Sequence, residues 1–140
     1  MKVVVSQTEE SIKIAQEIRK EVFVQEQGIP LHLDLDGLDL NSYHSLVFVD
    51  DKAVGVARLT LVENNRAVMA RVAIVKTYRG KGIATKLVES LIIKAKQLEI
   101  SGIEIHAHEY LREYYEKFGF GYIKHVETVG DHQLIEMYLA

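Results

Sequence analysis

The sequence predicts an α/β fold in which a mostly antiparallel sheet is flanked by helices. Residues 43–49, 53–63 and 66–75 are β-branched runs separated by turn residues, which is typical of an antiparallel meander. A strand, a long amphipathic helix and a second strand then follow one another over residues 66–107. A crossover of this length makes its two strands parallel. The expected sheet is therefore mixed, with a parallel pair inside it.

The N-terminal residues predict a strand and a helix. Residues 2–6 are apolar enough for a short strand, and Thr8 followed by two glutamates is a favourable helix start. Residues 12–23 carry an apolar face at helical spacing, and Gly28 and Pro30 are expected to end the helix.

The next segment, residues 31–41, alternates leucine with Asp34, Asp36 and Asp39. Three aspartates raise the question of calcium, but the closing glutamate and the following helix of an EF-hand are missing. We expect a solvated acidic loop.

The C-terminal half predicts a helix, a strand, a short helix and a hairpin. These are residues 82–98, 103–107 and 111–118, and 124–128 paired with 133–139. Gly130 and Asp131 are expected to form the hairpin turn.

Length and composition predict one domain over residues 1–140. A net charge of -3 gives no general attraction to nucleic acid or to an anionic membrane, so neither is an expected partner. The absence of cysteine excludes disulfides and thiolate nucleophiles. The first apolar stretch is too short for a signal peptide and no run could span a bilayer, so we expect a cytoplasmic protein.

The most informative stretch lies where a predicted strand gives way to a helix. Residues 68–75 are aliphatic, and apolar positions over residues 83–98 repeat at three and four residues. Gly80 and Gly82 leave the main chain of the intervening turn uncovered. Free N–H groups and the helix dipole make such a helix start an anion site, which favours a phosphorylated ligand. The alternative is a glycine-rich turn with two solvated cations.

Two familiar phosphate loops fit this stretch poorly. A Walker loop needs Ser or Thr after Gly-Lys, whereas Lys81 is followed by Gly82, and a dinucleotide fingerprint needs a third glycine where Thr85 stands. The pattern of Arg79, Gly82 and Ala84 between a strand and a helix instead resembles the acyl-CoA pyrophosphate loop of the GCN5-related N-acetyltransferases, the GNAT family.

Two further segments resemble the same family. Residues 18–30 are similar to the N-terminal signature of its ElaA and YjcF-like bacterial branch. Residues 114–120, Tyr-Tyr-Glu-Lys-Phe-Gly-Phe, resemble its Phe-Tyr-x-x-x-Gly-Phe motif. The resemblance therefore extends over about residues 18–139, and the three segments fall on the elements where the family has them.

The resemblance implies a GNAT fold whose central parallel strands splay apart around the pantetheine arm of acetyl-CoA. The expected donor-binding residues are Val72, Ile74, Arg79, Gly80, Lys81, Gly82, Ile83, Ala84 and His108. Tyr115 falls at the family position of the general acid, where its hydroxyl would protonate the departing thiolate. Its alternative role is packing beside Tyr114.

The general base is left open by the sequence. Residues 68–75 contain no acid, although the resemblance implies a glutamate there in some relatives, so Glu26, His44, His106 and His108 remain candidates for the base. Glu26, His44 and His106 are the residues expected on the acceptor side. His106 and His108 share one face of a strand, as metal ligands often do, but no third ligand at recognisable spacing accompanies them. We therefore expect no metal.

Two functions are compatible with these residues. The first is an N-acetyltransferase in which a primary amine of a small molecule or peptide attacks acetyl-CoA directly in a ternary complex. The second is a non-catalytic acyl-CoA-binding or sensing module. Tyr115 favours the enzyme, and the missing strand acid favours the module. The sequence does not identify the acceptor, and a homodimer is compatible with it.

Overall fold

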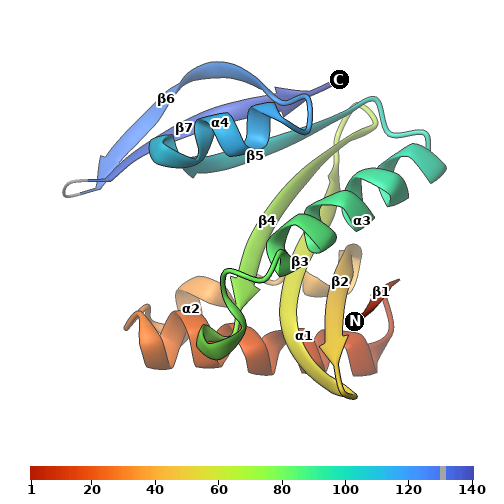
Figure 1. The fold of residues 1–140 in the computed structure, drawn as a ribbon. Coiled ribbons are helices and arrows are strands. Elements are labelled where there is room, and N and C mark those ends of the chain that lie inside the picture. Colours follow the sequence, from red (N-terminus) through yellow and green to blue (C-terminus); the bar gives the residue numbers. More distant parts are fainter. Residues whose placement is uncertain (130–131) are drawn as a thin grey trace.

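The computed structural model describes residues 1–129 and 132–140, and its strands form one mixed sheet (Figure 1). The order of these strands is β1-β2-β3-β4-β5-β7-β6. Strands β4 and β5 run parallel, and each other neighbouring pair is antiparallel. The predicted mixed sheet with an inner parallel pair is therefore confirmed.

The elements lie close to their expected positions. The strands are β1 Lys2–Ser6, β2 Ser42–Val49, β3 Lys52–Val62, β4 Arg66–Ile74, β5 Gly102–His108, β6 Gly121–Val129 and β7 His132–Leu139. The α-helices are α1 Glu9–Arg19, α2 Leu31–Asp34, α3 Ile83–Gln97 and α4 Arg112–Glu116. Shorter helical turns are η1 Lys20–Glu26, η2 Asp39–Asn41, η3 Lys76–Tyr78 and η4 Glu109–Leu111. The predicted hairpin turn at Gly130 and Asp131 lies outside the described residues.

The first helix begins as the sequence predicts but changes its winding. Thr8 Oγ1 accepts a hydrogen bond from the N–H of Ser11, which caps α1. From Lys20 onward the chain continues as the π-helical turn η1, where one α-helix was expected. Gly28 has a φ of 73° and Pro30 follows it, so the helical segment ends where predicted.

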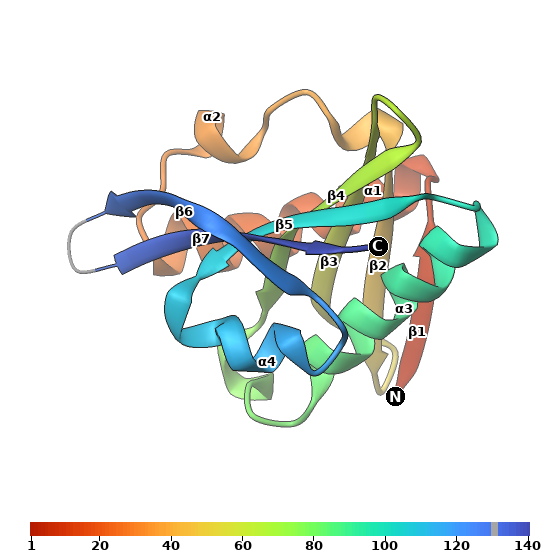
Figure 2. The same ribbon diagram turned by 90° about the horizontal axis from the view of Figure 1, so that it is seen from above.

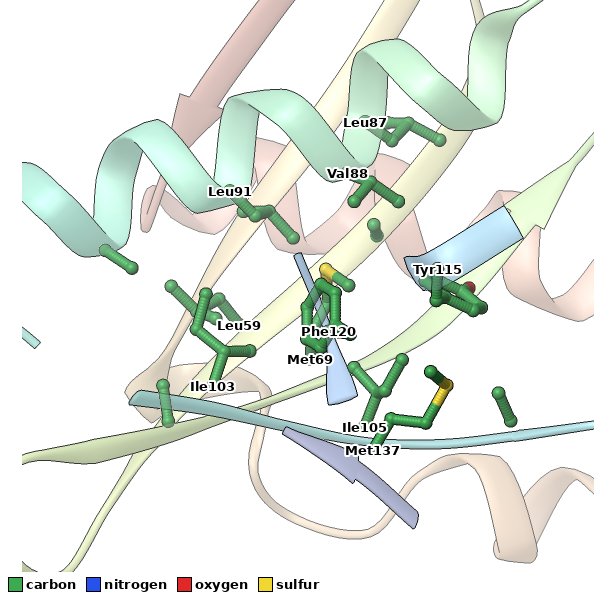
Figure 3. Close-up of a cluster of buried hydrophobic side chains, with 14 of the residues drawn as sticks. Leu59, Met69, Leu87, Val88, Leu91, Ile103, Ile105, Tyr115, Phe120 and Met137 are labelled. Atoms are coloured by element: carbon green, nitrogen blue, oxygen red, sulfur yellow. The ribbon is translucent and has the colours of Figure 1, made fainter. Parts of the chain in front are cut away.

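Helices cover both faces of the sheet. The larger core cluster lies between the sheet and α3, and Figure 3 shows Leu87, Val88 and Leu91 of α3 facing Met69 and the β5 side chains. A second cluster packs α1 against the opposite face. A fully buried leucine such as Leu87 contributes about 1.5–3 kcal/mol to folding. This packing fixes the position of α3 on the sheet.

The start of α3 approaches the sheet unusually closely. A Cβ added to Gly55 of β3 would come within 2.8 Å of Ile83 Cγ2. Glycine at this position therefore lets the first turn of α3 lie directly on β3. Because the glycine-rich loop leads directly into α3, this contact also fixes the distance of the loop from the sheet.

The parallel strands diverge after a short pairing. Arg66, Ala67 and Val68 of β4 pair with residues 102–104 of β5, and beyond them β5 continues its pairing with β7 alone. Figure 1 shows β4 and β5 separating toward their C-terminal ends. Within residues 1–129 and 132–140, no helix has the length and apolar character needed to cross a membrane.

Candidate active site

A cleft of about 880 Å³ opens where β4 and β5 part. Residues 69–74 of β4 and residues 105–108 of β5 form its two walls. The start of α3 and Tyr115 line one end, while side chains of η1 and α2 line the other. The cleft therefore connects the glycine-rich loop to the N-terminal helical segment.

A β-bulge in β4 shapes the first wall. Arg71 and Val72 together lie opposite the single residue Ala57 of β3, and Arg71 has a φ of 59°, which is uncommon for any residue except glycine. The extra residue reverses the alternation of side chains. Met69 packs in the α3 cluster, whereas Ala73, four residues on, packs in the α1 cluster. Because a bulge interrupts the ladder, main-chain groups near Val72 are available to a ligand in the cleft.

The glycine-rich loop presents an open helix start. Gly80 and Gly82 have φ values of 77° and 79°, and a Cβ on either glycine would meet nothing within 4 Å. Gly82 immediately precedes the first residue of α3, whose first N–H groups have no acceptor within the helix. Uncovered N–H groups at the positive end of the helix dipole suit an anion such as a pyrophosphate.

Most of the predicted donor-binding residues lie together. Those that line the cleft are Val72, Ile74, Arg79, Gly80, Gly82, Ile83, Ala84 and His108. Lys81 is exposed at the loop and is not part of the cleft wall.

Arg79 is held by an ion pair with Glu26. Its Nε donates to the Ile74 carbonyl at 2.9 Å, and its two terminal nitrogens donate to the two carboxylate oxygens of Glu26, each at 2.6 Å. The hydrogen bond from Arg79 is the main reason why the pKa of Glu26 lies below its usual value. The structure thus joins a residue expected on the acceptor side to one expected on the donor side, and it ties η1 to the glycine-rich loop.

Tyr114 and Tyr115 both line the cleft but sit in different surroundings. Tyr115 is buried in the α3 core cluster, where its ring makes edge contacts with Tyr114 and Phe120 (Figure 3). Burial raises the pKa of Tyr115 to about 12. The Tyr114 hydroxyl instead shares a 2.9 Å hydrogen bond with Thr85 Oγ1 of α3. Tyr115 therefore keeps its proton at neutral pH, as a general acid must.

The two β5 histidines line the other wall. The His108 ring stacks on Tyr110 with 5.3 Å between centroids. His106 Nε2 lies 3.1 Å from Glu104 Oε2 and 3.6 Å from Glu136 Oε1. Neither glutamate is indicated by the sequence, because one is two residues away on the same strand and the other comes from β7.

His44 does not reach the cleft. Its side chain projects from β2 into the protein interior, and its Nε2 donates to the Asp39 carbonyl at 2.9 Å. Burial lowers its pKa, so the ring is neutral. Of the three residues expected on the acceptor side, the structure brings His106 into the cleft, places Glu26 at its edge on Arg79, and leaves His44 in the interior.

Residues 31–41 are not the solvated acidic loop that the sequence predicts. Arg19, which is 1% exposed, donates through Nε to Asp34 at 3.0 Å and through a terminal nitrogen to Asp39 at 2.8 Å. Both aspartates are buried. The prediction is wrong because the balancing cation comes from α1, so no spacing within the acidic segment reveals it.

Asp36 ties the same segment to the sheet. Arg58 of β3 donates to its two carboxylate oxygens at 2.9 and 2.8 Å, and the bulge residue Arg71 donates to it at 3.2 Å. We call the six residues Arg19, Arg58, Arg71, Asp34, Asp36 and Asp39 the arginine–aspartate cluster. It fixes both α2 and the β4 bulge, and so supports one wall of the cleft.

The fold and the site together define a class of protein. A cleft between diverging parallel strands, with an open helix start for a pyrophosphate and a buried tyrosine beside it, is the arrangement of acyl-CoA-dependent acyltransferases. The chain belongs to the acetyltransferase (GNAT) family, whose family model matches residues 11–120.

Similar proteins agree with this assignment. The uncharacterized N-acetyltransferase YjcF of Bacillus subtilis is 30% identical over 120 residues, which are 86% of this chain and 85% of that protein. An acyl-CoA N-acyltransferase from Pseudomonas aeruginosa has a TM-score of 0.87 at 26% identity and covers 99% of each chain. Escherichia coli ElaA has the same fold, with a TM-score of 0.85, 22% identity, and coverage of 99% of this chain and 100% of that one. The prediction of an acetyltransferase of this family is confirmed.

Proposed function

We propose that this protein transfers an acetyl group from acetyl-CoA to a primary amine of a small molecule or peptide, and that the amine attacks the thioester while both substrates are bound. The observation that carries this proposal is that one cleft contains the glycine-rich start of α3, the bulged wall of β4 and Tyr115. The start of α3 would hold the pyrophosphate, the β4 wall would orient the thioester, and Tyr115 would protonate the departing thiolate.

Successive parts of the cleft match successive parts of acetyl-CoA, from the pyrophosphate to the thioester. A side chain at Gly80 or Gly82 would meet nothing within 4 Å, so there is room for a pyrophosphate beside the N–H groups at the start of α3. Beyond Val68 β4 no longer pairs with β5, so main-chain groups near Val72 and Ile74 on the cleft side would meet the pantetheine arm and the thioester carbonyl. Tyr115 lines the cleft between the strands and the α3 start, where the thiolate would leave.

The donor site can be tested by adding bulk to the loop. Gly82→Val should abolish binding of acetyl-CoA measured by calorimetry, because the new side chain would occupy the open space above the N–H groups. Gly37→Val is the matched control, since Gly37 has a φ of 80°, equally open surroundings and no place in the cleft. Each substitution forces a branched residue into the left-handed region at a cost of about 1–2 kcal/mol.

The two variants separate strain from lost binding. Both should keep a native circular dichroism spectrum, and the Gly37→Val protein should bind acetyl-CoA like the wild type. An affinity of Gly82→Val equal to that of the wild type would show that the pyrophosphate lies elsewhere.

A further inference from the structure

The side chains of Glu104, His106 and Glu136 gather on one face of the sheet, and His106 among them lines the second wall of the cleft. Ile103, Ile105 and Ala107 of β5 point into the α3 core, so the alternating residues 104 and 106 face the other way. Figure 2 shows α4 and α2 on opposite sides of β5. The three polar side chains therefore face away from the buried core, on the side of the sheet opposite Tyr115's packing partners.

The register of the sheet holds this group together. His106 is paired directly across from Glu136 of β7, and Glu104 lies two residues earlier on its own strand. Ligand atoms of the three side chains lie within 4.8 Å of one another. Nε2 of His106 is 3.1 Å from Glu104 and 3.6 Å from Glu136, so the imidazole edge and the two carboxylates form one polar group.

Charged side chains surround His106. The carboxylates of Glu104 and Glu136 lie 3.1 and 3.6 Å from its Nε2. Arg66 of β4 lies 3.2 Å from the other oxygen of Glu104, and Lys124 of β6 is paired opposite Glu136 in the strand register. The ion pair with Arg66 holds Glu104 in place.

Apolar side chains line the cleft together with His106. They are Phe23 of η1, Ile29, Leu33 of α2 and Leu134 of β7. Gln27, Asp34 and Arg71 also line the cleft, and the charges of Asp34 and Arg71 are paired with each other at 3.1 Å. Apolar walls bind an apolar body, and two carboxylates bind an ammonium group. An acceptor with a single positive charge and an apolar body would match both the carboxylates and the apolar walls.

We propose that His106 is the general base of this enzyme, that Glu104 and Glu136 bind the acceptor's ammonium group, and that the acceptor is a monocationic primary amine with an apolar body. This proposal rests on the proposed function. It adds the substrate class and the base that the sequence leaves open.

The proton balance is complete with the residues named. His106 takes one proton from the ammonium group and releases it to solvent. The neutral amine then attacks the thioester carbon, so that a C–N bond forms as the C–S bond breaks, and the thiolate leaves with the proton of Tyr115. The second proton lost by the nitrogen restores Tyr115, and one proton is released overall.

The test compares pH profiles of kcat/KM for 2-phenylethylamine in wild-type and His106→Gln proteins. Near pH 7 the variant should be slower by about a hundredfold or more, because the amine is almost fully protonated there. The loss should shrink toward about pH 10, where the amine gives up its proton unaided. His125→Gln, on the exposed face of β6, is the matched control and should behave like the wild type.

A second variant and a second probe keep the test decisive. Glu136→Gln should raise KM for 2-phenylethylamine at least tenfold and leave the affinity for acetyl-CoA unchanged. Glycine, a small zwitterion, should be a poor acceptor for the wild type. An unchanged pH profile in His106→Gln, or equal use of glycine and 2-phenylethylamine, would overturn the proposal.

Two further outcomes are distinct. Loss of wild-type activity in EDTA with recovery on adding zinc would also overturn the proposal, because the three side chains would then hold a metal. Wild-type protein that binds no acetyl-CoA would contradict the proposed function itself, whereas donor binding combined with a normal His106→Gln profile contradicts only the assignment of the base.

Discussion

Tyr115 shows how burial can suit a side chain to one chemical role. Its ring lies in the core, and desolvation of the phenolate raises its pKa to about 12. A hydroxyl with such a pKa can donate a proton to a thiolate and cannot act as a base near neutral pH. Tyr114, one residue earlier, is partly exposed, and its hydroxyl shares a hydrogen bond with Thr85 Oγ1. Neighbouring residues of one short helix thus lie in different surroundings.

Removing the Tyr115 hydroxyl should affect turnover and leave donor binding unchanged. Tyr115→Phe should lower kcat by about ten- to a thousandfold, the range expected when a general acid is lost. Tyr114→Phe is the control and should change kcat little, although losing the bond to Thr85 should reduce stability by about 1 kcal/mol.

The pKa of Tyr115 also leads to a prediction about how kcat depends on pH. The acid is active in its protonated form, which persists up to a pKa of about 12, so wild-type kcat should show no alkaline decline caused by Tyr115 between about pH 8 and 10. If both tyrosine variants lose activity equally and slightly, Tyr115 is a packing residue and the acid is another group.

At the scale of elements, the arginine–aspartate cluster joins α1, β3, the β4 bulge and residues 34–39. Burying an ion costs several kcal/mol, so such a group is stable only when its members pair fully. Burial disfavours the charged form of Asp39, but hydrogen bonds from Arg19 and Gln16 outweigh it, and the pKa of Asp39 lies well below its ordinary value. The cluster therefore depends on Asp36 and Asp39 remaining ionised.

Neutralising Asp39 should destabilise the fold. Asp39→Asn removes one of the two carboxylates that pair with buried Arg19 and one of the two that pair with buried Arg58, and the free energy of unfolding in urea should fall by about 3–5 kcal/mol. Asp50→Asn, in the exposed turn between β2 and β3, should stay within about 0.5 kcal/mol of the wild type.

Acid should reproduce this loss in the wild type. Because the pKa of Asp39 is lower in the folded state than its unfolded value of about 3.9, the unfolded state binds more protons below that pH. The stabilisation is complete above that range and decreases as pH falls, and Asp36, whose pKa is also lowered, adds to the trend. Urea titrations from about pH 6 to 3 should show a steeper decline in the wild type than in Asp39→Asn. Parallel declines would mean that Asp39 does not drive acid unfolding.

At the scale of the whole molecule, the features that can be predicted from the sequence are those that depend on residues close together in the chain. Strand alternation, the apolar stripe of α3 and the glycines at its start lie within a few residues of one another, and family resemblance supplied Tyr115. The remaining features join distant positions. Nothing near Asp39 indicates Arg19, and only the insertion of β7 between β5 and β6 places Glu136 beside His106. The residues expected to bind the donor therefore lie together in the structure, with Lys81 alone outside the cleft wall, whereas His44, expected on the acceptor side, lies in the interior.

The arrangement of the whole cleft leads to a kinetic prediction. The chain contains no cysteine, and the described side chains that line the cleft include no serine, so the wall offers neither usual nucleophile to carry an acetyl group between two half-reactions. The cleft instead runs from the glycine-rich loop past Tyr115 to His106 and Leu33, which lets both substrates occupy it at once. Initial-rate plots at several fixed concentrations of 2-phenylethylamine should therefore intersect. Parallel lines, together with an acetylated protein detected by mass spectrometry when acetyl-CoA is added without an amine, would establish a covalent intermediate and exclude direct attack.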